Sequence, residues 1–78
     1  MIRFRLKELL AEKEFAERKV ISLTEVATAT GMNRMTLSRI ANHPGTNTGT
    51  ENIDKLCKYF NCEVSQLMQY IPDDTQNT

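Results

Sequence analysis

The stretch "SLTEVATATGMNRMTLSRIANH", residues 22–43, decides the fold of this chain. Apolar residues recur at helical spacing on both sides of Gly31, which indicates two short helices joined by a tight turn. The stretch contains two arginines, and it has no acidic residue after Glu25. Lys and Arg total 10 in the whole chain, and Asp and Glu also total 10. The absence of carboxylates is therefore a local feature of this segment.

Start and stop signals frame both helices of the segment. Ser22 and Glu25 match the S-x-x-E capping box, in which each side chain satisfies a free backbone N–H of the other residue. Gly31 is expected to end the first helix, because a positive φ costs glycine little. Asn33 is a good N-cap for the second helix. The apolar face of that second helix is predicted to consist of Leu37, Ile40 and Ala41.

An amphipathic helix is predicted before the segment, over residues 6–19. Its apolar positions are Leu6, Leu9, Leu10 and Phe15 or Ala16. Ile2 and Phe4 precede it in an alternating pattern, which indicates a short extended arm.

The residues after the segment predict a loop and two more helices. Residues 43–49, "HPGTNTG", are loop by their Pro, Gly and Asn content. A fourth helix is expected to begin near Thr48 or Thr50 and to end at Asn61. Thr48 with Glu51 would form a second capping box. The apolar face of this helix would be Ile53, Leu56, Cys57 and Phe60.

A short fifth helix is predicted over roughly residues 64–70, and Pro72 stops it. It carries the apolar residues Leu67, Met68 and Ile71. We therefore expect an all-α, compact five-helix domain over residues 1–72, followed by a flexible C-terminal tail at 73–78.

Composition narrows the class of protein. The chain has 78 residues, of which 40% are apolar and 26% are charged, as in a soluble globular domain. It has no long apolar run and no signal-peptide pattern, so we expect a cytoplasmic protein with no membrane partner. Cys57 and Cys62 are then expected to be reduced.

Two short helices joined through "TGMN" fit a helix-turn-helix at about residues 22–42. In that motif the second helix, here about 34–42, lies in the major groove of double-stranded DNA. Arginine can form two parallel hydrogen bonds to guanine there. A carboxylate on the same face would be repelled by the phosphates, which gives the missing acidic residues a physical reason.

The chain also resembles the phage-repressor-like (Cro-like or XRE-like) helix-turn-helix regulators. The resemblance rests on "LTEVATATGMNRMTLSRIAN" and, downstream, on "IDKLCKYFNCEVSQLMQYIPDD", and so covers nearly the whole chain. It implies a DNA-binding regulator of the repressor type. Carried over by position, it implies DNA contacts from Ser22, Asn33, Arg34, Met35, Thr36, Ser38, Arg39, Asn42 and His43.

The resemblance also implies how these contacts are divided. Arg34, Met35 and Arg39 stand at base-reading positions, whereas Ser22 and Asn42 stand at phosphate-contacting positions. The family often has lysines in the loop after the recognition helix, but residues 43–49 have none. Uncharged groups would contact phosphates there, so we expect a shallow salt dependence of binding.

Simpler interpretations exist for each of these residues. The two arginines alone would be ordinary solvated charges, and Met35 alone would be a core residue. One histidine and two cysteines do not make a zinc site, and Cys57 is most simply a small core residue. We find no catalytic cluster and no glycine-rich phosphate loop, so we expect no enzyme, no cofactor and no small-molecule effector.

Two functions of different classes remain. The first is a sequence-specific transcriptional regulator that binds a roughly palindromic operator as a homodimer. Its dimer surface would use the apolar residues near the chain ends, namely Leu67, Met68, Tyr70 and Ile71 with Ile2 and Phe4. The second is an antitoxin or protein-binding adaptor that uses the same fold.

Overall fold

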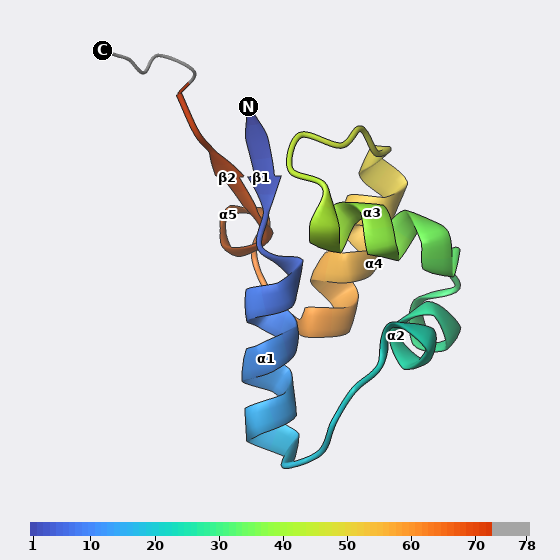
Figure 1. The fold of residues 1–78 in the computed structure, drawn as a ribbon. Coiled ribbons are helices and arrows are strands. Elements are labelled where there is room, and N and C mark those ends of the chain that lie inside the picture. Colours follow the sequence, from blue (N-terminus) through green and yellow to red (C-terminus); the bar gives the residue numbers. More distant parts are fainter. Residues whose placement is uncertain (73–78) are drawn as a thin grey trace.

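The computed structural model describes residues 1–72, and the tail predicted at 73–78 lies outside the described residues. The elements in chain order are β1 (Ile2–Phe4), α1 (Leu6–Glu17), α2 (Leu23–Thr30), α3 (Arg34–Asn42), α4 (Thr50–Phe60), α5 (Val64–Leu67) and β2 (Met68–Tyr70) (Figure 1). The expectation of a compact, mostly helical fold is confirmed, and the part described has five helices. A short two-stranded sheet is added to them.

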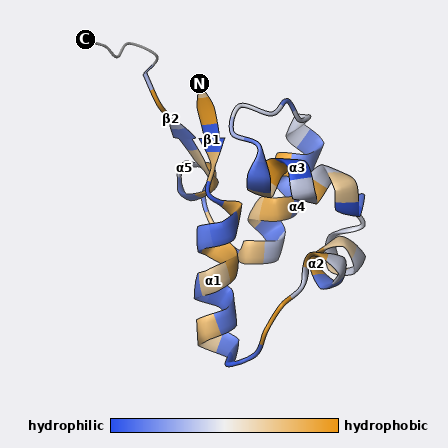
Figure 2. Ribbon diagram, viewed as in Figure 1, coloured by the Kyte–Doolittle hydropathy of each residue, from blue (hydrophilic) through white to orange (hydrophobic). Residues whose placement is uncertain are grey.

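Each helix contributes one fully buried side chain to a single core. These five side chains are Leu6, Val26, Leu37, Leu56 and Leu67. Hydrophilic and apolar residues alternate along α1 and α4, as expected for helices with one buried face (Figure 2). Burying an aliphatic side chain contributes roughly 1.5–3 kcal/mol, so helices too short to be stable alone are held by this shared core.

The apolar face predicted for α1 is correct only in its first half. Leu6 and Leu9 are buried, whereas Phe15 is 86% exposed and Ala16 is also exposed. In Figure 1 the C-terminal end of α1 extends past α4, so a residue of the last turns can lie beyond the packed helices. The prediction for Phe15 was wrong because Phe15 follows Leu6 by nine residues, which at about 100° per residue puts it on the opposite side of α1.

The C-terminal prediction was wrong in one respect, because the fifth helix ends at Leu67 and the next three residues form β2. β2 pairs in antiparallel register with β1, so that Ile2 lies opposite Tyr70 and Phe4 opposite Met68. The extended arm expected at the N-terminus supplies the hydrogen-bond partner. Sequence pattern alone does not show this partner, since it lies at the opposite end of the chain.

The sheet corrects the proposed dimer surface. Phe4 is 8% exposed and Leu67 is fully buried within one chain, so neither is available to a second copy. The side chains of Ile2 and Tyr70 remain exposed, at 39% and 67%. Met68 and Ile71 are half-buried.

The helix caps agree in part with the predictions. The Ser22 hydroxyl oxygen accepts a bond from the Glu25 backbone N–H at 3.1 Å, but the Glu25 carboxylate accepts from Lys19 instead of completing the box. Helix α4 begins at Thr50 with Gly49 as its N-cap, so the Thr48–Glu51 box was wrong. The Thr48 hydroxyl accepts from Asn52 at 2.9 Å.

The longest helix of the described part, α1, has 12 residues, and none of the described helices is long and apolar enough to cross a membrane.

Replacing Gly31 tests the turn of the helix-turn-helix. Its φ is +75°, and a Cβ there would meet no atom within 4 Å, so strain comes from the backbone alone. We expect Gly31→Ala to lower the free energy of unfolding by about 1 kcal/mol. Gly31→Asn should cost less, because Asn61 adopts a similar left-handed conformation in this chain. Urea unfolding followed by circular dichroism measures both, and equal losses would contradict the backbone explanation.

Leu9 and Phe15 provide a second test, because both lie on α1 but only Leu9 is buried. Leu9→Ala should lower the free energy of unfolding by about 2–5 kcal/mol through the cavity that it leaves. Phe15→Ala should change it by less than about 0.5 kcal/mol. Thermal unfolding of the two variants distinguishes them. A large loss for Phe15→Ala would mean that this side chain is covered in solution.

Candidate nucleic-acid interface

The turn between α2 and α3 is held at three points. The Gly31 N–H donates to the Ala27 carbonyl oxygen at 2.8 Å and ends α2. The Thr30 hydroxyl donates to the Val26 carbonyl at 2.7 Å and accepts from the Met32 N–H at 3.2 Å. The Met32 side chain is itself buried. The direction in which α3 leaves the turn is therefore fixed by hydrogen bonds and by packing together.

Helix α3 has one buried and one exposed face. Leu37 and Ile40 are buried, and Ala41 is half-buried beside them. Successive residues of a helix are about 100° apart, so the positions on the other side span roughly 140° of the helix surface. Those positions are occupied by Arg34, Met35, Ser38, Arg39 and Asn42. All are exposed except Ser38, which is half-buried.

The two arginines of this face have no ion-pair partner in the described part of the chain. Among the described residues, neither Arg34 nor Arg39 forms an ion pair or a hydrogen bond from its guanidinium group. Residues 26–50, which include all of α3 and the loop after it, contain no Asp or Glu. The guanidinium groups are therefore available to an external acceptor without first breaking an intramolecular bond.

The ion pairs of the described chain lie on other elements. Lys13 pairs with Glu17 at 2.7 Å, and the hydrogen bond between them holds the pKa of the Glu17 carboxyl below its ordinary value. Arg3 pairs with Glu8 and lowers the pKa of the Glu8 carboxyl through the same kind of bond. Two of the four carboxylates of α1, Glu8 and Glu17, thus pair with cations of the N-terminal part of the chain.

The Met35 side chain is exposed, as a contact with DNA would require. Met35 is 65% exposed at the second position of α3, so it is not a core residue. Its thioether group adds an apolar contact surface between Arg34 and Arg39. A flexible apolar side chain at this place can contact a thymine methyl group in the major groove.

The polar residues of the predicted site serve partly as caps. The Asn33 side-chain oxygen accepts from the Met35 N–H at 2.7 Å, so the predicted N-cap is confirmed and its amide NH₂ points away from that bond. The Ser22 hydroxyl accepts its cap bond and keeps its own proton to donate. Both residues are exposed. Each can hold its helix start and still offer a donor.

Asn42 is more constrained than the sequence suggested. Its side-chain NH₂ donates to the Ser38 carbonyl at 3.0 Å and approaches the Ser38 hydroxyl at 3.4 Å. A phosphate contact from Asn42 therefore has to use the second hydrogen of this amide or replace the bond to Ser38. The amide is held against the end of α3, which restricts where it can point.

The remaining predicted residues lie at the edges of the exposed face. Thr36 is half-buried on the flank of α3, and His43 is exposed immediately after the helix. Thr46 and Asn47 follow in the loop, where Gly45 turns the chain at a φ of +82°. The Gly45 N–H donates to the Ile2 carbonyl at 3.0 Å, which ties this loop to β1.

One cation near this face was missed by the sequence interpretation. Lys7, in the first turn of α1, lines a cavity of about 270 Å³ together with Asn42 and Pro44. Lys7 is exposed and forms no ion pair within residues 1–72. No sequence pattern indicates this position, because thirty-five positions separate Lys7 from Asn42 and only the folded chain brings them to the same cavity.

Comparison with known proteins agrees with this geometry. A family model of the Cro/C1-type helix-turn-helix DNA-binding domain matches residues 5–73, from the start of α1 past the end of β2. Domains of this family bind DNA and are not typically enzymes. No curated protein matches the chain. Because the family model covers nearly the whole sequence, the chain belongs to the Cro/C1-type helix-turn-helix DNA-binding domain family.

Proposed function

We propose that this protein is a sequence-specific transcriptional regulator that inserts α3 into the major groove of double-stranded DNA. The observation that carries the proposal is the exposed, acid-free face of α3, on which neither arginine has an ion-pair partner among residues 1–72. A major groove admits one α-helix, and phosphates flank it on both sides. A face of this composition suits that environment, because it brings no carboxylate near a phosphate.

Some side chains of α3 contact bases, and the polar residues around them contact phosphates. Arg34 and Arg39 lie about one and a half turns apart on α3, and each donates to the edge of a base. Met35, between them on the helix surface, contacts the methyl group of a thymine. Sequence preference therefore comes from a few side chains at the N-terminal and central parts of α3, while the polar residues around them fix the register.

Phosphate contacts come mainly from uncharged groups. Ser22, Asn33, Asn42 and the loop after α3 offer hydroxyl, amide and backbone donors. Lys7 adds one charge on the side of Asn42, where the two line one cavity. Few counterions are then released on binding, so affinity falls less steeply with salt than for a basic domain of this size.

A homodimer would present two α3 helices to successive major grooves, about 34 Å apart. The exposed apolar pair Ile2 and Tyr70 lies on the two strands and belongs to this proposed dimer surface. Half-buried Met68 and Ile71 adjoin it on β2 and just after it. Such a regulator acts where the DNA is, which is the cytoplasm expected from the sequence.

A protein-binding role is the second candidate, and one observation favours it. Phe15 and Val20 are 86% and 85% exposed near the end of α1 and in the link to α2. Two large apolar side chains left in water are typical of a surface that meets another protein. An antitoxin or adaptor of this fold would use that surface and would not need base contacts from α3.

Arginine substitutions test the regulator. After selection of a preferred site from random oligonucleotides, Arg34→Ala and Arg39→Ala should each weaken binding to it by about 1–3 kcal/mol and relax preference at one base position. Lys58→Ala removes the same charge from an exposed position on α4 and is the matched control. The affinity of Lys58→Ala for the selected site should stay within about twofold of the wild-type affinity. Fluorescence anisotropy with specific and random duplexes measures all three.

Two outcomes would contradict this proposal. If selection at low salt enriches no site, the protein is not a sequence-specific regulator, and the protein-binding role becomes the better one. If the arginine variants lose equal affinity for specific and random DNA, the arginines contact phosphates and do not read bases. Asn42→Ala is expected to show that uniform loss.

Tyr70 tests the dimer. Tyr70→Asp places a charge on the exposed apolar pair of the sheet. The dissociation constant of the dimer should therefore rise at least about tenfold above that of the wild type. Val20→Asp places the same charge on an equally exposed apolar residue far along the chain and should leave the dimer unchanged. Sedimentation equilibrium measures the dissociation constants. Equal effects of both substitutions, or a monomeric wild type at operator-saturating concentrations, would place the dimer elsewhere or remove it.

A further inference from the structure

The end of α4 brings the two cysteines of the chain together. Asn61 adopts a left-handed conformation with a φ of 52°, and its N–H donates to the carbonyls of Cys57 and Lys58. The Cys62 N–H donates back to the Cys57 carbonyl at 3.0 Å. These bonds form a Schellman motif, in which the residue after the left-handed position packs on the last full turn of the helix. Here both residues of that contact are cysteines.

The two thiols lie on the same side of this helix end, against the core. Both side chains are half-buried and pack against the same core, at the two ends of the backbone hydrogen bond from Cys62 to Cys57. Burial first, and then the neighbouring Cys57, raises the pKa of the Cys62 thiol above its ordinary value. Both thiols are free in the structure. The helix end thus places two reduced cysteines next to each other at the two contact positions of the Schellman motif.

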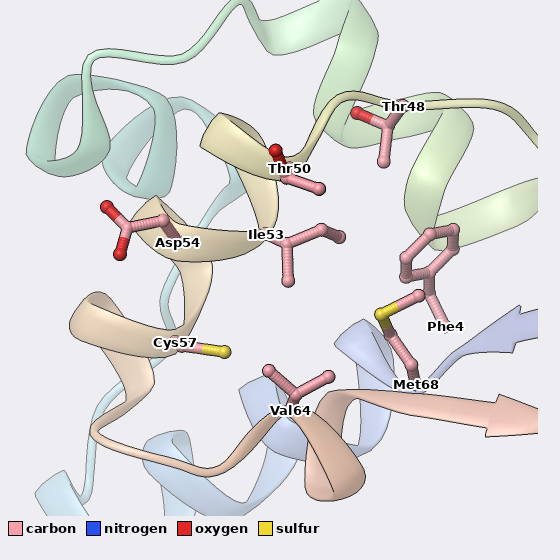
Figure 3. A pocket seen from close by; sticks show the side chains of 8 residues that line it. All are labelled: Phe4, Thr48, Thr50, Ile53, Asp54, Cys57, Val64 and Met68. Atoms are coloured by element: carbon pink, nitrogen blue, oxygen red, sulfur yellow. The ribbon is translucent and has the colours of Figure 1, made fainter.

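Cys57 is also accessible to a small molecule. It lines a cavity of about 420 Å³ between α4, α5 and the strands, whose other lining residues include Phe4, Ile53, Val64 and Met68. Figure 3 shows the Cys57 sulfur pointing into this cavity and Val64 facing it from α5. A reagent that enters the cavity can therefore reach one thiol of the pair.

A metal site does not explain the pair. Within residues 1–72 no group of three or more His, Cys, Asp or Glu residues gathers, so the two sulfurs have no further ligands of that kind. Two neighbouring thiols, one of them lining a cavity, are an arrangement that allows thiol–disulfide exchange.

We propose that Cys57 and Cys62 form a dithiol that exchanges with low-molecular-weight disulfides to give an intramolecular Cys57–Cys62 disulfide. The Cys57 thiol loses its proton to solvent, and its thiolate attacks one sulfur of the external disulfide, releasing the other half as a thiolate. Cys62 then loses its proton and attacks the Cys57 sulfur, and the second half leaves. Two protein S–H bonds are replaced by one S–S bond, and the external disulfide is reduced to two thiols.

The disulfide would fasten the end of α4 to the start of α5. α5 has only four residues and leads directly into β2, so this bond would restrain the segment that pairs with β1. It would not touch α3. Folding and disulfide formation are linked equilibria. If folding favours the disulfide by a given factor, the disulfide favours the folded state by the same factor. The oxidised protein should therefore have the higher Tm.

The experiment uses the full chain in buffers of reduced and oxidised glutathione. Intact mass should show the loss of two hydrogen atoms without a lasting glutathione adduct, and free-thiol titration should fall from two thiols to none. The equilibrium ratio of disulfide to dithiol should be about tenfold or more higher for the native than for the urea-unfolded chain. The rate should rise with pH, because exchange needs thiolates and the pKa of Cys62 is raised.

Single variants show the order of attack. Cys62→Ala should retain one glutathione adduct on Cys57, whereas Cys57→Ala should react more slowly, because its remaining thiol does not line the cavity. The wild-type measurements test the proposal even if a variant does not fold. Stable mixed disulfides, disulfide-linked dimers, no reaction, or equal native and unfolded equilibria would each overturn the proposal.

Discussion

The burial of Leu37 and Ile40 beneath α3 is the constraint on which the rest of the interface depends. A helix is a rigid cylinder with a fixed angular spacing, so turning two positions inward determines what every other position faces. Arg34, Met35 and Arg39 are directed outward as a consequence. Any change that rotated α3 on its core would move its whole exposed face at once, which is why the candidate site cannot be separated from the packing beneath it.

The turn before α3 makes this orientation rigid. Gly31, Thr30 and Asn33 satisfy the backbone groups that two adjacent helix ends would leave unpaired. Val26 of α2 is fully buried and meets the same core as Leu37. Helix capping and core packing therefore both hold α3 in the same orientation. A small domain of short helices has few other means of holding one helix at a defined angle.

The charge distribution shows why net charge is a poor guide to function in this chain. The sequence is neutral overall, but its carboxylates and cations are not evenly mixed. Lys13, Lys19 and Arg3 lie in ion pairs with glutamates on α1 and α2, whereas the arginines of α3 have no such partner among the described residues. Potential at a surface depends on which charges lie within a Debye length of about 8–10 Å. A neutral protein can thus carry a locally cationic helix face.

Local sequence patterns determined much of this protein. The helix starts at Ser22 and Asn33, the stops at Gly31 and Asn61, and the buried face of α3 all follow from signals a few residues apart, and the structure confirms them. The same patterns placed the candidate site, because helical spacing that buries Leu37 and Ile40 leaves the two arginines outside.

Tertiary structure alone decided what depends on distant partners. Residues 68–70 have a helical pattern but form β2, because β1 offers backbone hydrogen bonds from the other end of the chain. Ala16 fits the apolar face of α1 but is exposed, and Lys7 lines the same cavity as Asn42 only because of the fold. Periodicity records which side of a helix is apolar. It does not record whether a second surface exists to meet that side, since this is a property of the assembled chain.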